Sequence, residues 1–195
     1  MINSVVIYTT TYCFVGKPIE INHFYEKLKQ HKILTELSEV FRFKPHPYCN
    51  GQIDYIDTNY KSGDSKFYIT TETRIEPMHK VFEDILGGFY PSIECFWQVN
   101  EPQQKVFETN DTTGEYFPEK YILIHDFVNK EYKHFHDLVK FETEESLLVY
   151  ANYILNQHFT TIPQINDYAK LNIKEPEVFE IHEYEIKGGI REMVW

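Results

Sequence analysis

The chain has 195 residues, of which 42% are hydrophobic and 25% are charged. These proportions are typical of soluble globular domains and exclude collagen-like, low-complexity and fully disordered chains. Nineteen Lys and Arg against 30 Asp and Glu give a formal net charge of -11. This charge disfavours direct binding to nucleic acid, because phosphates are also negative. The chain has no apolar run of ~18 residues and no signal-peptide pattern at its start, so we expect a cytoplasmic protein without membrane contact.

In the first half of the chain, the periodicity of apolar residues predicts strands and helices in alternation. The β-branched run at 2–8 predicts the first strand. Apolar residues at helical spacing then predict helices over 20–30 and 33–41. Residues 51–58 and 66–73 read as a hairpin, because alternating runs flank the turn residues Ser62-Gly63-Asp64-Ser65.

The middle of the chain predicts one helix followed by strands. Met78, Val81, Phe82, Ile85 and Leu86 form a helical stripe, which we expect Gly87-Gly88 to end. Alternation over 92–98 predicts a strand, and 104–109 continues to a turn at 110–114.

Five further elements are expected towards the C-terminus. Strands are predicted at 115–127 and 131–142, separated by Asn129-Lys130. A helix over 144–158 begins after Thr143, whose side chain suits a helix N-cap. A short helix near 162–171 and a last strand near 177–187 follow.

The order of elements over residues 66–110 resembles a known family. Residues 66–73 lead through Glu76-Pro77 into a helix, and Phe89-Tyr90-Pro91 and the segment 107–111 follow. This order resembles the YubB ferredoxin-like domain family of bacterial and plasmid proteins, although Arg74-Ile75-Glu76-Pro77 stands where that family has a Trp and its first Pro. The resemblance implies a ferredoxin-like fold for about the first 115 residues and assigns no catalytic residue.

We therefore predict an α+β fold, with a mainly antiparallel sheet and helices on one face. Residues 1–115 are expected to form the ferredoxin-like unit. Residues 116–195 are expected to form a C-terminal α+β extension packed on it, either as a separate part or within one single domain.

Histidines suggest one metal site. His134 and His136 lie two apart on a predicted strand, so their side chains share a face. His125 lies on the preceding strand, and the three could ligate a metal ion across the hairpin. A solvated polar face is the alternative interpretation. Cys13, Cys49 and Cys95 include no C-x-x-C pair and indicate free thiols, and no nucleotide-binding loop motif is present, so we expect no cofactor.

Three function classes follow from these observations. The first is an accessory protein of a bacterial mobile element that binds another protein through exposed aromatic residues. The second is a metal-dependent enzyme using His125, His134 and His136. The third is an acidic mimic of nucleic acid that acts on a host DNA-binding protein. The third class rests on six acidic residues in the C-terminal segment, namely Glu175, Glu177, Glu180, Glu183, Glu185 and Glu192.

A homodimer is also expected. Helix 144–158 carries Tyr150, Tyr153 and Phe159 beside its inward face, so its apolar arc is wider than one core contact requires. Met193-Val194-Trp195 adds apolar surface at the C-terminus. A symmetric dimer would cover one such patch on both copies.

Overall fold

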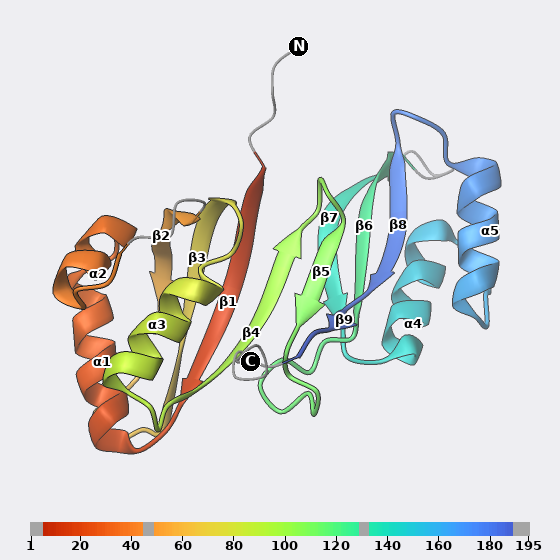
Figure 1. Cartoon of the computed structure of the whole chain (residues 1–195). Helices are drawn as coiled ribbons and strands as arrows, with labels where there is room; N and C mark the ends of the chain where they lie inside the picture. The colour runs from red at the N-terminus through yellow and green to blue at the C-terminus, as the bar shows by residue number, and fades with distance from the viewer. Residues whose placement is uncertain (1–5, 45–48, 129–132, 189–195) are drawn as a thin grey trace, which may run out of the picture. The chain divides into compact units, whose positions relative to one another are not determined.

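Two separate sheets organise the chain, and helices accompany each of them (Figure 1). The computed structural model describes residues 6–44, 49–128 and 133–188. It confirms an α+β fold. The chain divides into two compact units, one of Met1–Phe117 with Ile186–Trp195 and one of Pro118–Glu185. In the described residues, no helix has the length and apolar character needed to span a membrane.

The first unit is built on a six-stranded sheet in the order β2-β3-β1-β4-β5-β9. Its strands are β1 (Ile7–Val15), β2 (Cys49–Ile56), β3 (Lys66–Ile75), β4 (Glu94–Glu101), β5 (Val106–Thr109) and β9 (Glu185–Ile186). All pairings among β1 to β5 are antiparallel. The central strand β1 places Tyr12 between Ile69 of β3 and Trp97 of β4.

Three helices pack on one face of this sheet, namely α1 (Pro18–Gln30), α2 (Leu34–Val40) and α3 (His79–Phe89) (Figure 1). The core between them is aromatic. The Phe14 ring centroid lies 4.9 Å from that of Phe24 and 5.1 Å from that of Phe82. Burial of each such ring contributes about 1.5–3 kcal/mol, so this layer is a main source of stability.

Two expectations for the first unit are wrong in detail. The first strand covers Ile7–Val15 instead of 2–8, and residues 1–5 lie outside the described part. Gly87-Gly88 do not end the third helix, which continues to Phe89. The Phe89 ring packs on Phe41, with 5.4 Å between centroids, and this contact favours continuation of the helix through the two glycines, which cost about 1 kcal/mol each.

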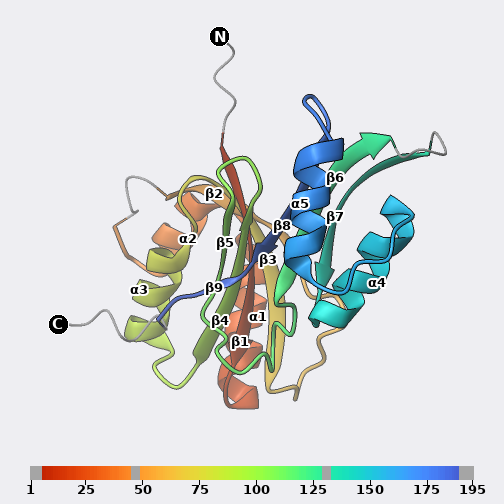
Figure 2. The same cartoon turned by 90° about the vertical axis from the view of Figure 1, so that its right-hand side faces the viewer.

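The second unit is a three-stranded antiparallel sheet in the order β7-β6-β8. Its strands are β6 (Tyr121–Val128), β7 (His134–Phe141) and β8 (Val178–Glu183). Helices α4 (Glu144–Leu155) and α5 (Ile162–Asn172) cover one face, as Figure 2 shows. Leu123 and Phe127 of the sheet pack there against Leu147, Ala151 and Ile154 of α4.

The predicted helix over 144–158 is confirmed, with a shorter C-terminal end. Thr143 caps its N-terminus, since its hydroxyl accepts a hydrogen bond from the Ser146 amide at 3.2 Å. The helix ends at Leu155 because Asn156 adopts the left-handed conformation, with φ of 51°. The last predicted strand, near 177–187, is interrupted at Tyr184 and forms β8 and β9.

Candidate functional site

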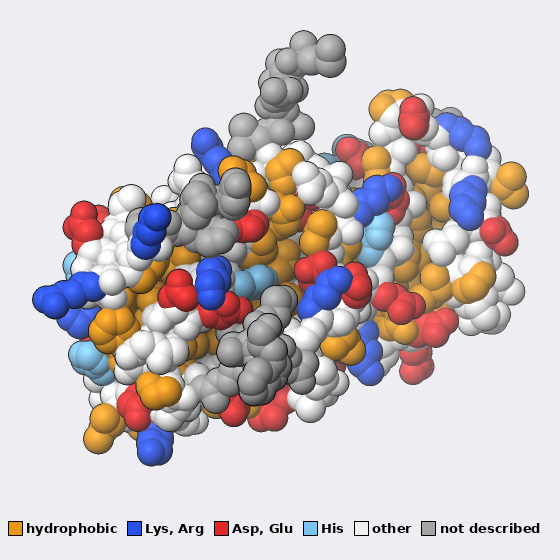
Figure 3. All heavy atoms as spheres, in the orientation of Figure 1, with side chains coloured by type: hydrophobic (Ala, Val, Ile, Leu, Met, Phe, Trp, Pro, Cys, Tyr) orange, Lys and Arg blue, Asp and Glu red, His pale blue; other side chains and the backbone are white. Residues whose placement is uncertain are grey.

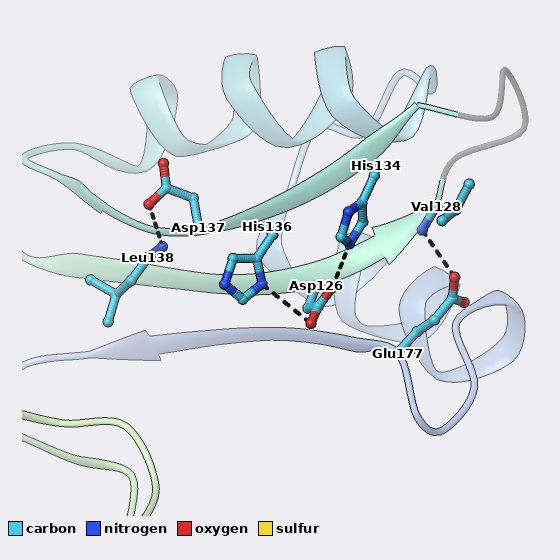
Figure 4. Close-up of polar contacts among 7 residues, drawn as sticks. All are labelled: Asp126, Val128, His134, His136, Asp137, Leu138 and Glu177. Carbon is cyan, nitrogen blue, oxygen red and sulfur yellow. Dashed lines mark hydrogen bonds and ion pairs between the residues drawn. The ribbon is translucent and has the colours of Figure 1, made fainter.

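The register between β6 and β7 decides which polar side chains meet. Asp126 lies directly opposite His136, and Val128 lies directly opposite His134. Since side chains alternate along a strand, Asp126, His134 and His136 share the sheet face that α4 and α5 leave uncovered. Figure 4 shows the two imidazoles on either side of the Asp126 carboxylate.

Both imidazoles contact this one carboxylate, and the contact of His134 is a hydrogen bond. The distance is 2.7 Å from Nε2 of His134 to Oδ1 of Asp126 and 3.2 Å from Nδ1 of His136 to Oδ2. The two ring centroids are 6.2 Å apart. The side chains of His134, His136 and Asp126 are 61%, 74% and 47% exposed, so solutes in water can reach all three.

Electrostatics favour the ionised form of Asp126. The hydrogen bond from His134 lowers the pKa of this carboxyl below its ordinary value, and the contact with His136 acts in the same direction. Asp126 therefore provides a fixed negative charge between two imidazoles at neutral pH. We call these three residues, Asp126, His134 and His136, the Asp–His cluster.

The structure does not bring His125 to this cluster. His125 pairs with Asp137 and projects towards the helices, where only 2% of it is exposed. Its Nε2 lies 3.0 Å from the Tyr150 hydroxyl, and burial lowers the pKa of its imidazole. The three predicted ligands are thus split between two faces of the sheet.

Sequence reasoning missed Asp126, because its place on this face depends on the register between β6 and β7. Directly opposed residues of an antiparallel pair share a face, and the two faces alternate along each strand. Because His125 lies opposite Asp137, Asp126 shares the face of His134 and His136. Within residues 6–44, 49–128 and 133–188, no group of three or more His, Cys, Asp or Glu could hold a metal ion. Two other carboxylates in Figure 4 are engaged with backbone: Glu177 accepts from the Val128 amide and Asp137 from the Leu138 amide.

Helix α4 presents a second feature on its outward side. Val149 and Tyr153, one turn apart, are 67% and 71% exposed. The other aromatic residues predicted to widen its apolar arc are engaged: Tyr150 with His125, and Phe159 with Tyr168 at 5.3 Å between ring centroids. Met193-Val194-Trp195 lie outside the described residues.

Two of the C-terminal glutamates have contacts within the chain. Glu177 accepts a backbone hydrogen bond, and Glu180 pairs with His182 at 3.2 Å. Glu192 lies outside the described residues. On the face shown in Figure 3, acidic and basic side chains are interspersed.

A scan against family models, a search of curated proteins and a search of solved structures found no match for this chain.

Proposed function

We propose that this chain is an accessory protein that acts by binding protein rather than by catalysis, and that the outward side of α4 carries the contact. The observation behind this proposal is the exposure of Val149 and Tyr153 on a helix whose other side is fully packed. Tyrosine is among the residues that most often anchor protein interfaces. A second copy of the chain is the partner, because one such patch serves both subunits of a symmetric dimer.

The topology of the first unit supports a ferredoxin-like assignment. Its first elements follow the order β1-α1-β2-β3-α3-β4, with α2 added after α1, and the strands lie as β4-β1-β3-β2. A βαββαβ order of elements is characteristic of ferredoxin-like domains, and this order therefore supports the assignment. Together with the resemblance of residues 66–110 to the YubB family, it supports a place among accessory proteins of bacterial mobile elements.

The state of the cysteines supports a cytoplasmic location as part of the proposal. Cys13 and Cys95 are buried and free. Burial raises the pKa of the Cys13 thiol to about 12 and that of Cys95 well above its ordinary value. Such thiols act as small apolar core groups and not as nucleophiles.

The acidic mimic receives less support than the protein contact, because Glu177 and Glu180 are used within the chain. The enzyme alternative loses its ligand set, since His125 lies on the other face of the sheet. Neither alternative is favoured by a specific contact.

Sedimentation velocity over a concentration series tests the dimer. We expect a monomer–dimer equilibrium that shifts towards dimer with salt, because the net charge of -11 repels a second copy and salt screens it. Burial of Val149 and Tyr153 is worth about 1.5–3 kcal/mol each. The double variant Val149→Ser/Tyr153→Ser should therefore weaken the dimer at least about ten-fold.

Leu171 on α5 provides the matched control, because it is 75% exposed and apolar. Leu171→Ser should leave the dissociation constant unchanged. A monomer at every concentration in both low and high salt, or a dimer that the double variant leaves intact, would contradict the proposal.

A further inference from the structure

We propose that the connection between β2 and β3 forms a binding site for a free basic amino acid, such as arginine. A pocket of about 290 Å³ lies there, close to the lower end of the ~300–1,000 Å³ range of small-molecule sites. Its lining combines charges of both signs with two aromatic residues and includes Asp57, Tyr60, Asp64, Ser65, Lys66 and Tyr68. The site belongs to the first unit and is independent of the α4 contact proposed above.

Hydrogen bonds hold the frame of this pocket. The Asp57 amide donates to the Tyr68 carbonyl at 2.8 Å, which joins the residue after β2 to β3. The Tyr25 hydroxyl of α1 donates to the Asp57 carbonyl at 2.9 Å. The Ser65 carbonyl accepts a hydrogen bond from the amide of Gly16, the residue after β1, at 2.9 Å. The connection is therefore tied to three neighbouring elements, and a ligand does not have to order it on binding.

The charged groups of the pocket are not paired with one another. Oδ1 of Asp57 accepts a hydrogen bond from the Asn59 amide at 2.9 Å. Oδ2 of Asp64 accepts one from the Lys61 amide at 2.9 Å. In the part of the chain that the structure describes, the second oxygen of each carboxylate has no hydrogen bond, and Lys66 forms no ion pair. Two carboxylate oxygens and one ammonium around one pocket therefore remain available to a ligand.

Aromatic rings hold the Lys66 ammonium at this pocket. Its Nζ lies 5.3 Å from the ring centroid of Tyr116 and 6.0 Å from that of Tyr68. Such cation–π contacts stabilise a cation and leave its charge in place, so Lys66 can still pair with a carboxylate. Tyr60 and Tyr68 belong to the lining, and aromatic faces also attract organic cations of a ligand.

The charges of the lining select the ligand. Asp57 and Asp64 against Lys66 leave an excess of negative charge. A basic amino acid carries the complementary groups, namely one carboxylate for the ammonium and two cations for the carboxylates. The guanidinium of arginine can also bond a carboxylate at two points and stack on an aromatic ring. An acidic amino acid has the opposite balance of charge, and a neutral one leaves one carboxylate of the pocket without a partner.

The electrostatic field around the pocket also favours a cation. Burial raises the pKa of the Tyr60 hydroxyl, and the negative charges of Asp64 and Glu26 raise it further. Burial likewise raises the pKa of Tyr25, with Glu26 and Asp57 acting in the same direction. Both phenols therefore experience a negative potential, and this potential attracts a ligand of net positive charge.

Titration of L-arginine into the full chain, followed by amide NMR spectra, tests the site. Signals of Asn59, Tyr60 and Lys66 should shift in a saturable manner, with a dissociation constant of about 1 mM or less. Added salt should weaken binding, because it screens the charges. Agmatine lacks the carboxylate and Nα-acetyl-L-arginine lacks the ammonium, so each should bind at least about three-fold more weakly. L-Glutamate should cause no such shifts.

Three variants remove the charges of the pocket one at a time. Asp57→Asn, Asp64→Asn and Lys66→Gln should each weaken arginine binding by at least about three-fold. Each asparagine keeps an oxygen that can accept the amide hydrogen bond, so the frame of the pocket is retained. Asp54→Asn and Lys61→Gln are the matched controls, because they remove the same charges from exposed residues outside the lining. Both should bind arginine within about two-fold of wild type.

Four results would overturn the inference. They are the absence of saturable shifts at about 10 mM arginine, equal binding of agmatine or L-glutamate, an equal loss of binding in the control variants, and shifts confined to residues outside the pocket. Equal binding of Nα-acetyl-L-arginine would overturn the assignment to a free amino acid and would indicate the C-terminal arginine of a peptide instead.

Discussion

His125 and Asp126 are neighbours in sequence, yet they belong to opposite faces of the β6–β7 sheet. His125 contacts Tyr150 beneath α4, and Asp126 accepts a hydrogen bond from His134 and contacts His136. The alternation of a strand therefore divides the chemistry of this unit in two. The inner face holds a neutral imidazole in the core, and the outer face holds the Asp–His cluster.

The first prediction concerns the pKa of Asp126. Because the His134 hydrogen bond lowers it, this contact favours the folded state above the ordinary carboxyl pKa and is lost as pH falls through the lowered value. His134→Phe should raise the Asp126 pKa, and His136→Phe should raise it less. Carbon-13 NMR titration of the carboxyl measures this, with His158→Ala as a control for loss of an exposed histidine. A pKa that does not respond to His134→Phe would contradict the assignment.

Partly buried His79 predicts acid sensitivity of the first unit. Its Nδ1 lies 3.0 Å from the Tyr12 hydroxyl and its ring lies 4.1 Å from Trp97, between centroids. Burial lowers its pKa from 6.5 to about 3. Between pH 6.5 and about pH 3, this histidine is therefore protonated in the unfolded chain and neutral in the folded chain. The free energy of unfolding therefore falls as the pH drops through this range.

The variant His79→Phe keeps an aromatic ring against Trp97 and removes the titratable imidazole. Between pH 6 and pH 4, the free energy of unfolding of wild type should fall more steeply than that of the variant, by up to about 1.4 kcal/mol per pH unit. Urea unfolding at each pH measures both slopes. Equal slopes would show that His79 is protonated in the folded protein.

Two glycines should respond to alanine in opposite directions. A Cβ at Gly51 would collide with the Glu72 carbonyl oxygen and would lie 2.8 Å from the Thr73 Cα, so Gly51→Ala should cost about 1–3 kcal/mol. A Cβ at Gly87 meets nothing within 4 Å, and α3 continues through this position. Gly87→Ala should therefore stabilise by up to about 1 kcal/mol. Thermal unfolding of both variants measures the two signs, and a tolerated alanine at residue 51 would refute the close approach of β2 and β3.

The caps of the two helices in the second unit offer another matched pair. Thr143 accepts a hydrogen bond from Ser146, whereas Thr161 begins α5 without a side-chain cap. Thr143→Ala should destabilise the unit by about 1 kcal/mol, and Thr161→Ala should cost clearly less. Urea denaturation followed by circular dichroism compares them, and equal losses would mean that the Thr143 bond contributes nothing.

Element types were predictable wherever the apolar pattern was long. Of the five positions expected to face inward on this helix, Leu147, Ala151, Ile154 and Leu155 are buried, and Leu148 is partly buried. The first strand was misplaced because Thr9, Thr10 and Thr11 read as polar, although β-branched threonine suits a strand. The end of α3 was misplaced because a local glycine signal was given more weight than the tertiary contact of Phe89 with Phe41.

The candidate site was predictable only in part, for a geometrical reason. Spacing along one strand places His134 and His136 together, but the partner from β6 depends on register, and a shift of one residue exchanges the faces. The turn predicted at Asn129-Lys130 lies outside the described residues. Composition alone could not show whether His125 or Asp126 shares the sheet face of His134 and His136.

The most direct measurement of the proposed protein contact is a dilution series of amide NMR spectra on the wild-type chain. As the chain dissociates, signals from Glu145, Val149 and Tyr153 on the outward side of α4 should shift together, while Leu171 should stay in place. Val149→Ser/Tyr153→Ser should abolish the concentration dependence. Spectra that do not change with concentration, or shifts that occur elsewhere and leave α4 unaffected, would contradict a binding role for this helix.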